Sequence, residues 1–450
     1  MLSIPVLVLA VPFPAMAEPW RLDAALGLPD SLSLSVEHRI RYEALDDQFR
    51  AGRAGNDDLL LLRTLVHGRW RVGGGLTLGA ELQDSRGYLD DPSTPLDTSA
   101  VNALELLQAY AEIETELFGG ASELRVGRIT MDVGSRRFVA RNRFRNTLNG
   151  FTGIDWSWEG SGGHTARAFY VLPLRRRPSD DDELRDDDIQ LDVESFDVQL
   201  WGLQSSTGLP CGDGRDRFEL FVFGLHEEAG AGGTRNRDLY TPGFRVWRSP
   251  RAGAFDYQIE SAVQFGGSRT ARTGGDLDHL AHFHHLEAGY TFDVPWSPRV
   301  ALQFDHASGD EDPDDGDDER FDTLYGARRF DFGPTSLYGP FARANLTTPG
   351  LRVQAKPRVG VSSFVAVRGF WLASDRDAWT PAGVRDPAGD SGRYLGTQIE
   401  WRIRWDLVPG NVHLETGLAH LFDGGFVRHA PDSNRQGDSS YGYAQLRFRL

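Results

Sequence analysis

The sequence has little of what a helical membrane protein or a disulfide-stabilised protein needs. Its 450 residues include one cysteine, Cys211, which excludes intramolecular disulfides and zinc sites built from several cysteines. Hydrophobic residues make up 40% of the chain and the mean hydropathy is −0.40. A membrane-spanning helix needs about 20 consecutive apolar residues, and the apolar run near residues 2–11 is too short. A bundle of transmembrane helices is therefore excluded.

The first residues of the chain have the pattern of a targeting segment. A short apolar run over residues 2–10 precedes Ala15-Met16-Ala17, which matches the small-residue cleavage signature of secretory signal peptides. The pattern predicts a signal peptide at residues 1–17, although no lysine or arginine precedes the apolar run. The alternative is a buried strand, and Pro12 and Pro14 argue against it.

The remaining chain, residues 18–450, reads as a succession of β-strands in one domain. Apolar and polar residues alternate with period two in residues 32–42, 255–265 and 397–405, which places one set on each face of a sheet. The last residues, 441–450, alternate in the same way. Similar but less regular runs occur at residues 60–70, 76–83, 107–113, 154–158, 300–304 and 412–418, and glycine-rich or proline-containing turns separate them.

Two architectures fit alternating strands: a soluble β-sandwich with its apolar face inward, and a membrane barrel with that face toward lipid. Dense charges of both signs on the polar faces suit a wet lumen. Aromatic residues such as Tyr290, Trp296, Trp401 and Trp405 lie near strand ends, as in interfacial girdles. At roughly 24 residues per strand and connection, the chain would form about 16 to 20 strands, enough to leave a lumen open. We predict the barrel.

Several ordered segments resemble one family of outer-membrane barrels. Residues 321–334 (FDTLYGARRFDFGP), 370–374 (FWLAS), 383–386 (GVRD) and 402–409 (RIRWDLVP) together are similar to the alginate-export family. The resemblance implies a single all-β, antiparallel transmembrane barrel of about 18 strands in the outer membrane of a Gram-negative bacterium. This sequence departs from the family pattern at Leu450, because such barrels usually end in Phe.

The resemblance also implies a function and partners. The family passes an anionic polyuronate outward through an open, polar, arginine-rich lumen, and loops close its extracellular mouth and its periplasmic side. A periplasmic scaffold and an outer-membrane lipoprotein with helical repeats would be partners. Outer-membrane lipid and lipopolysaccharide would surround a monomeric barrel, and no nucleic-acid partner and no cofactor are expected.

The formal net charge of −17 would repel a polyanion if it were spread evenly. The excess acid lies instead in residues 180–188 and 310–322, which we interpret as loops, and the rest of the chain is nearly neutral. A densely basic stretch within residues 127–149 holds six arginines. It alternates poorly, so we expect a loop folded into the pore or lying at its rim. It would concentrate a polyanion electrostatically or bind lipopolysaccharide phosphates.

Charged residues of one strand parity are expected to face the lumen. Arginine suits carboxylates because its planar fork donates two parallel hydrogen bonds and stays charged. The alternative role of such residues is to pair with acids across neighbouring strands. The residues predicted to line the pore and bind substrate are Arg39, Arg41, Arg63, Arg69, Arg128, Arg137, Arg352, Lys356, Arg368, Glu400, Arg402 and Arg404.

Two groups of residues raise the question of metal binding. Asp310, Asp312 and Asp314 are weak calcium candidates, because alternate carboxylates before a glycine suit a hard cation, but the spacing misses the EF-hand pattern. A solvated loop is favoured there. His282 and His284 share a strand face, whereas His285 points the other way. No acidic partner completes a ligand set, so incidental clustering is favoured.

Three functions remain open from the sequence. The first is passive export of an anionic polysaccharide, which the ordered segment 321–334 favours because so wide a pore needs occluding loops. The second is a porin that takes up small anions or acidic oligosaccharides. The third is an outer-membrane enzyme or adhesin, which we do not predict because the sequence contains neither Gly-x-Ser-x-Gly nor His-Glu-x-x-His.

Overall fold

The structure is a computed structural model and describes residues 18–210, 214–230, 235–269, 274–433 and 437–450. The predicted signal peptide, residues 1–17, and Cys211 lie outside the described residues.

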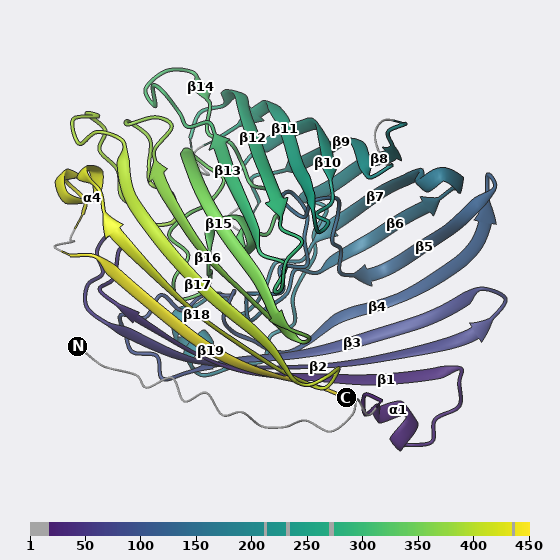
Figure 1. The fold of residues 1–450 in the computed structure, drawn as a ribbon. Coiled ribbons are helices and arrows are strands. Elements are labelled where there is room, and N and C mark those ends of the chain that lie inside the picture. Colours follow the sequence, from purple (N-terminus) through teal and green to yellow (C-terminus); the bar gives the residue numbers. More distant parts are fainter. Residues whose placement is uncertain (1–17, 211–213, 231–234, 270–273, 434–436) are drawn as a thin grey trace.

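Eighteen antiparallel strands in the described chain form a closed barrel, because β1 pairs with both β2 and β19 (Figure 1). A further two-residue strand, β14 (Asp317–Asp318), adds to β12 in parallel. The barrel strands are β1 (Leu32–Asp46), β2 (Asp57–Gly73), β3 (Leu76–Tyr88), β4 (Asn102–Leu117), β5 (Gly120–Ile129), β6 (Phe151–Glu159), β7 (Thr165–Pro173), β8 (Val198–Gly208), β9 (Asp216–Glu227), β10 (Arg237–Arg248), β11 (Ala254–Ser268), β12 (Leu277–Thr291), β13 (Arg299–Ala307), β15 (Leu346–Arg358), β16 (Val361–Trp371), β17 (Tyr394–Val408), β18 (Val412–Asp423) and β19 (Ser439–Arg449). The predicted all-β barrel of about 18 strands is confirmed.

The helices are all short and lie in connections between strands or before the first strand. They are α1 (Leu22–Ala25), the 3₁₀ turn η1 (Ser161–Gly163), α2 (Asp181–Arg185), α3 (Arg329–Phe332) and α4 (Gly425–His429). Within the described residues, no helix has the length and apolar character to cross a membrane.

The connections differ at the two ends of the barrel. Tight turns such as residues 359–360 and 409–411 join strands at one end, which we call the turn end. Gly410 has φ of +83°, which favours glycine at the turn between β17 and β18. Longer segments join strands at the other end, the loop end, where β14 and α4 lie (Figure 1). The two longest are residues 174–197 and 308–345.

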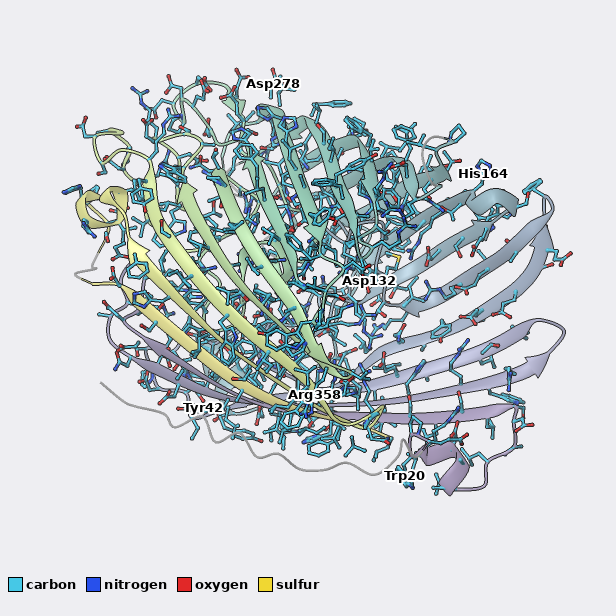
Figure 2. The ribbon with its side chains drawn as sticks, viewed as in Figure 1. Trp20, Tyr42, Asp132, His164, Asp278 and Arg358 are labelled. Carbon is cyan, nitrogen blue, oxygen red and sulfur yellow. The ribbon has the colours of Figure 1, made fainter. Side chains whose placement is uncertain are left out.

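The alternation in the sequence corresponds to two faces of the barrel wall. On β1, Arg39 and Arg41 point inward and are 2% and 0% exposed, whereas Ile40 and Tyr42 point outward and are 39% and 43% exposed. Figure 2 shows Tyr42 on the outside of the barrel. Apolar side chains facing out and charged side chains facing in are typical of transmembrane barrels. The parity predicted from the sequence is therefore confirmed on this strand.

Burial along the strands shows that only half of the lumen is open. On β2, inward residues from Asp57 to Leu65 are buried near the loop end, whereas residues 69–73 at the turn end are exposed on both faces. β4 shows the same change, with residues 113–117 exposed. An open polar lumen with loops closing its ends was expected. The structure has one at the turn end, and connections that fold inward fill the loop end.

Apolar packing holds the filled half together. The rings of Phe341 and Phe370 stack in parallel with centroids 3.4 Å apart, and Trp379 stacks on Phe49 at 5.6 Å. Together they join three loop-end connections to β16. Aromatic pairs of this kind add to the free energy of burial. The filled half therefore packs as a small protein core inside the barrel.

Candidate functional site

Two inward connections meet inside the barrel and obstruct it. Residues 130–150 and residues 308–345, together called the plug here, pair through their backbones. The amide of Tyr325 donates to the carbonyl of Phe138 at 2.9 Å, and the amide of Ala327 donates to Arg136 at 2.9 Å. Figure 2 shows Asp132, on the first plug segment, near the middle of the molecule. Apart from residues 127–129, which end β5, the basic stretch of residues 127–149 is thus a loop folded into the pore, one of the two placements expected.

A buried ion-pair network joins the two plug segments to the wall. Arg137 on the first segment forms a fork with Asp331 on the second, at 2.9 and 3.0 Å, and also pairs with Glu260 on β11 at 2.6 Å. Arg343 pairs with the same Asp331. Burial would raise the pKa of Asp331, but Arg137 and Arg343 hold that pKa well below its usual range. Asp331 therefore stays ionised in the closed plug.

Several wall arginines predicted to bind substrate bind the plug instead. Arg39 donates to the carbonyls of residues 143, 144 and 145 at 3.0–3.2 Å and to Asn146 Oδ1 at 2.9 Å. Arg63 donates to two of the same carbonyls, at 3.0 and 3.3 Å. Arg368 reaches the carbonyl of Asp331 at 2.8 Å and Arg352 that of Phe330 at 3.0 Å. These side chains face the lumen as predicted, and their role toward substrate stays a prediction.

Three further predicted residues also lie in contacts with the protein itself. Arg41 is fully buried, pairs with Glu43 at 2.6 Å and lies 4.5 Å from the Phe144 ring centroid. Glu400 pairs with Arg329 of the plug at 2.6 Å. Arg128 pairs with Glu105 at 2.6 Å and Glu194 at 2.8 Å. Pairing with acids, the alternative considered for lumen arginines, is therefore common here.

The remaining predicted residues lie in the open turn-end half. Lys356 and Arg402 line a cavity of about 370 Å³ with Arg299 and Ser363, and Arg402 lies over the Phe364 ring at 4.5 Å. Arg404 is about half exposed and pairs with Glu415. Across the lumen, Arg69 lines another cavity and pairs with Glu112 at 2.5 Å. This open turn-end half of the lumen, called the vestibule here, carries charges of both signs.

Beyond the plug, toward the loop end, lies a cavity of about 380 Å³, called the outer chamber here. Six arginines line it: Arg50, Arg145, Arg235, Arg237, Arg320 and Arg328. Two of them have acidic partners, since Arg237 pairs with Glu227 and Asp322, and Arg320 with Asp377. Loop carbonyls accept from two others: Arg50 donates to Tyr338 at 2.7 Å and Arg328 to Phe341 at 3.2 Å.

Asp97, Asp318 and Asp322 line the outer chamber beside the six arginines, but several arginines there lack a direct acidic partner. Within the described chain, no carboxylate forms an ion pair with Arg50, Arg145, Arg328 or the nearby Arg176. Asp97 is the carboxylate that attracts all four. Burial and the neighbouring Arg145 and Arg50 lower the pKa of Arg328 to about 9. Burial and Arg145 lower the pKa of Arg176 to about 10. Such a group of arginines is suited to bind an anion.

Sequence reasoning missed several residues that hold the plug or line the outer chamber in the loop-end half of the barrel. Arg50, Arg328, Asp331 and Arg343 were not singled out, although residues 328–331 lie in the segment that carried the family resemblance. A buried loop has no periodic signal, and its ion pairs join residues far apart in the chain. The arginine-rich composition was the available signal.

The calcium candidates do not converge in the structure. Asp310 is buried and accepts no hydrogen bond at Oδ1, whereas Asp312 and Asp314 are exposed on the loop. Three donor atoms of His285, Asp305 and Asp331 lie within 4.8 Å of one another. Arginines already neutralise that group, because Arg368 pairs with Asp305 and Arg137 with Asp331. Cation binding there would need those arginines to leave.

Comparison with known proteins gives the family. A model described as Alginate export matches residues 30–438, nearly the whole chain. The chain belongs to the alginate export family. None of the curated proteins compared is similar enough in sequence to be called a relative.

Solved structures of outer-membrane proteins share the fold of this family member. OccK9 (OpdG) of Pseudomonas aeruginosa superposes with a TM-score of 0.60 at 14% identity, covering 94% of this chain and 98% of its own. OccAB1 of Acinetobacter baumannii gives 0.61 at 10% identity, with coverages of 94% and 97%. OpdK of P. aeruginosa, solved with vanillate, gives 0.60 at 11% identity, with coverages of 93% and 98%.

The family and the fold place the barrel in the Gram-negative outer membrane, where it is a channel. In such barrels the short turns face the periplasm and the longer loops face the exterior. The turn end is therefore periplasmic and the loop end extracellular. The open vestibule faces the periplasm, and the plug and outer chamber lie toward the outside.

Proposed function

We propose that this barrel exports an anionic polysaccharide of the polyuronate type, with the plug as its gate. The observation that carries the proposal is the outer chamber, where Arg50, Arg145 and Arg328, with Arg176 nearby, form no ion pair within the described chain and are attracted in common by Asp97. A polyuronate presents one carboxylate per sugar, and guanidinium groups bind carboxylates with charge-assisted hydrogen bonds. The chamber would hold one segment of the polymer at a time.

The periplasmic vestibule supports the same direction of transport. Its exposed inward residues leave a wide entrance for a polymer arriving from the periplasm. Two ion pairs, Arg404 with Glu415 and Arg69 with Glu112, place positive and negative charges side by side in the vestibule. Weak binding at many sites allows release, whereas strong binding at one site would block the pore.

Transport requires the plug to move. Ion pairs and side-chain-to-carbonyl bonds hold it to the wall, as in Arg137 with Asp331 and Arg39 with the carbonyls of residues 143–145. Polymer carboxylates can compete for these guanidinium groups, which would then bind substrate as predicted from the sequence. The barrel strands keep their backbone pairing throughout.

Planar-bilayer recording of the purified protein tests the proposal. Arg145→Gln combined with Arg328→Gln should lower anion-over-cation selectivity and weaken block by an added polyuronate. Arg393→Gln is the matched control, because Arg393 lies in the loop 372–393, outside the chamber, and its side chain is about half exposed. Unchanged selectivity and unchanged block in the double variant would refute the role of the chamber.

A second function, uptake of small anions or acidic oligosaccharides, is favoured by one observation. The outer chamber, at about 380 Å³, has the size of a small-ligand pocket, and OpdK, which shares the fold, was solved with the carboxylate vanillate. Block by monomeric uronate as strong as block by the polymer would favour uptake. Block that strengthens with chain length would favour export.

The partners of the channel remain part of the proposal. Export needs a periplasmic scaffold and a repeat-containing lipoprotein to deliver the polymer, since a barrel has no energy source of its own. We propose that the barrel works as a monomer in lipopolysaccharide-containing membrane. No cofactor is assigned to it.

A further inference from the structure

The cavity of about 370 Å³ in the vestibule, called the entrance pocket here, is built on one row of the barrel wall. The row consists of residues that share one face and occupy directly paired positions on the neighbouring strands β12, β13, β15, β16 and β17: Thr291, Arg299, Gln354, Phe364 and Arg402. The turn between β10 and β11, residues 249–253, borders one end, where Ala252 bridges to Thr291. The pocket is thus a continuous shelf across five strands.

Basic side chains line the entrance pocket without acidic ones. Arg251, Arg299, Lys356 and Arg402 reach its surface, and no aspartate or glutamate of the described residues does. The outer chamber differs, because aspartates line it as well. Glu287 pairs with Arg299 at 2.6 Å. Lys356 and Arg402, in the part of the chain that the structure describes, form no ion pair and no side-chain hydrogen bond. The pocket therefore presents two uncompensated cations.

An aromatic ring holds one of these cations in place without neutralising it. The guanidinium carbon of Arg402 lies 4.5 Å from the centroid of the Phe364 ring, and that of Arg352 lies 4.8 Å from the same centroid. Phe364 is buried, with 6% of its surface exposed. A guanidinium stacked on a ring keeps its N–H groups directed sideways, in its own plane. Arg402 can therefore donate parallel hydrogen bonds to a carboxylate.

A buried hydroxyl on the same shelf lacks a partner. Thr291 lines the pocket and is 8% exposed, and its Oγ1 has no hydrogen-bond partner among the described residues. Buried polar atoms are nearly always hydrogen-bonded, so an unpaired one on the lining of a cavity indicates a ligand group that pairs with it. A threonine hydroxyl both donates and accepts, which suits the hydroxyl group of a sugar.

The other side of the vestibule carries the opposite charge. A cavity of about 570 Å³ on β4 to β8 is lined by Glu114, Glu123 and Glu159 together with one arginine, Arg167. In the order of strands around the barrel, this cavity lies nearly opposite the entrance pocket. The field between the two walls directs an anion toward the entrance pocket and away from the glutamates.

We propose that the entrance pocket binds one uronate residue, with its carboxylate between Lys356 and Arg402 and a sugar hydroxyl on Thr291. The choice of a uronate rests on the proposed export of a polyuronate, whereas the preference for a carboxylate rests on the pocket alone. The volume of the pocket lies within the usual range for small-ligand sites. The pocket is the first anion site that a polymer meets on its way from the periplasm.

The entrance pocket adjoins the gate. Arg352, which shares the Phe364 ring with Arg402, donates to the plug carbonyl of Phe330 at 3.0 Å. A polymer held by Arg402 therefore has its next carboxylate placed to compete for Arg352. The site would hand the chain from the vestibule to the plug.

The test uses Lys356, the only lysine of the chain, as its probe. Reductive methylation with ¹³C-formaldehyde labels its Nζ in the purified full-length protein in lipid nanodiscs and keeps its charge. Lys356→Arg assigns the signal. Glucuronate should shift this signal saturably, and glucose, which lacks the carboxylate, should not. Arg402→Gln should weaken glucuronate binding by about tenfold or more, because it loses hydrogen bonds to a charged group.

Arg358→Gln is the matched control. Arg358 on β15 also lies over an aromatic ring, Trp405, at 4.6 Å, but it does not line the pocket. This variant should bind glucuronate as the wild type does, and circular dichroism checks that each barrel is intact. The proposal is overturned if glucuronate leaves the Lys356 signal of the folded wild type unmoved. It is also overturned if folded Arg402→Gln binds glucuronate as tightly as the wild type.

Failure of this site and failure of the proposed export give different results. Block of the channel by a polyuronate in planar bilayers, without a glucuronate shift at Lys356, would remove the entrance pocket and leave export standing. A saturable shift without block by the polymer would support the pocket and remove polyuronate export.

Discussion

Arg137 and Asp331, 194 residues apart in the chain, form a two-pronged ion pair at 2.9 and 3.0 Å inside the barrel. Each residue lies on a different inward segment, and both are almost fully buried. The pair ties residues 130–150 to residues 308–345, and the Glu260 carboxylate ties the same arginine to β11. The two plug segments are thus held to each other and to the wall by a few identifiable charges.

Arg137→Gln should open the plug. Removing one partner of a buried ion pair costs about 3–5 kcal/mol because the other charge is left uncompensated; here Glu260 loses its arginine and Asp331 keeps only Arg343. Single-channel recording should show a larger mean conductance and shorter closures. Arg136→Gln is the control, because Arg136 is exposed, although both arginines lie over the Phe330 ring, Arg136 at 5.1 Å and Arg137 at 5.4 Å. Equal conductance in both variants would contradict this role for Arg137.

Gly326→Ala should also weaken closure, by a steric route. An added Cβ at Gly326 would collide with the backbone carbonyl of Arg137, where the two plug segments pair. The segments would have to separate, so we expect increased leak of small ions from proteoliposomes. Gly316→Ala, in the same connection, meets nothing within 4 Å and should behave as the wild type. Normal leak in Gly326→Ala would show that the pairing does not control closure.

Neutralising Arg402 and Arg404 together should reduce anion selectivity. Both lie on the open periplasmic half of β17, and Arg402 has an aromatic face, Phe364, rather than a carboxylate beside it. Loss of two positive charges leaves Glu415 to repel anions. Reversal potentials in planar bilayers under a KCl gradient measure the change. Selectivity equal to the wild type would remove both residues from the ion pathway.

Acid should stabilise the closed plug through Asp310. Burial and the neighbouring Asp377 raise the pKa of Asp310 to about 6, above the usual value of about 3.9. Because this pKa is raised in the closed state, protonation of Asp310 stabilises that state. The stabilisation is complete below about pH 4 and is lost as pH rises through about 6. Closed dwell times should therefore be longer at pH 5 than at pH 7.

The pH effect has a direct control in the same segment. Asp310→Asn should flatten the dependence, whereas Asp314→Asn, at an exposed position, should leave it intact. A dependence that survives Asp310→Asn would assign it to another group.

The fold was predictable because a barrel wall has a strong and local signal. Alternation in residues 32–42, 255–265 and 397–405 identified β1, β11 and β17, and parity put Arg39, Arg41 and Arg63 inside. Other strands escaped notice where the pattern is interrupted, as at Pro242 and Gly243 of β10.

The site was less predictable because its contacts are not local. The carbonyls that Arg39 binds lie about a hundred residues further along the chain. The sequence could not show whether an inward arginine meets water or a plug. The same limit applies to the histidines: His306 lies opposite His284 only through the register of β12 with β13.

Acidic and basic side chains share the extracellular end of the barrel. The acidic segments at residues 180–188 and 310–322 hold exposed carboxylates, but Asp318 and Asp322 of the second segment line the outer chamber beside its arginines. Screening confines each field to about 8 Å at physiological salt, so an anion in the chamber would sense these carboxylates together with the arginines. Under the proposed export, this mixture of charges would shorten the residence of each polymer segment in the chamber.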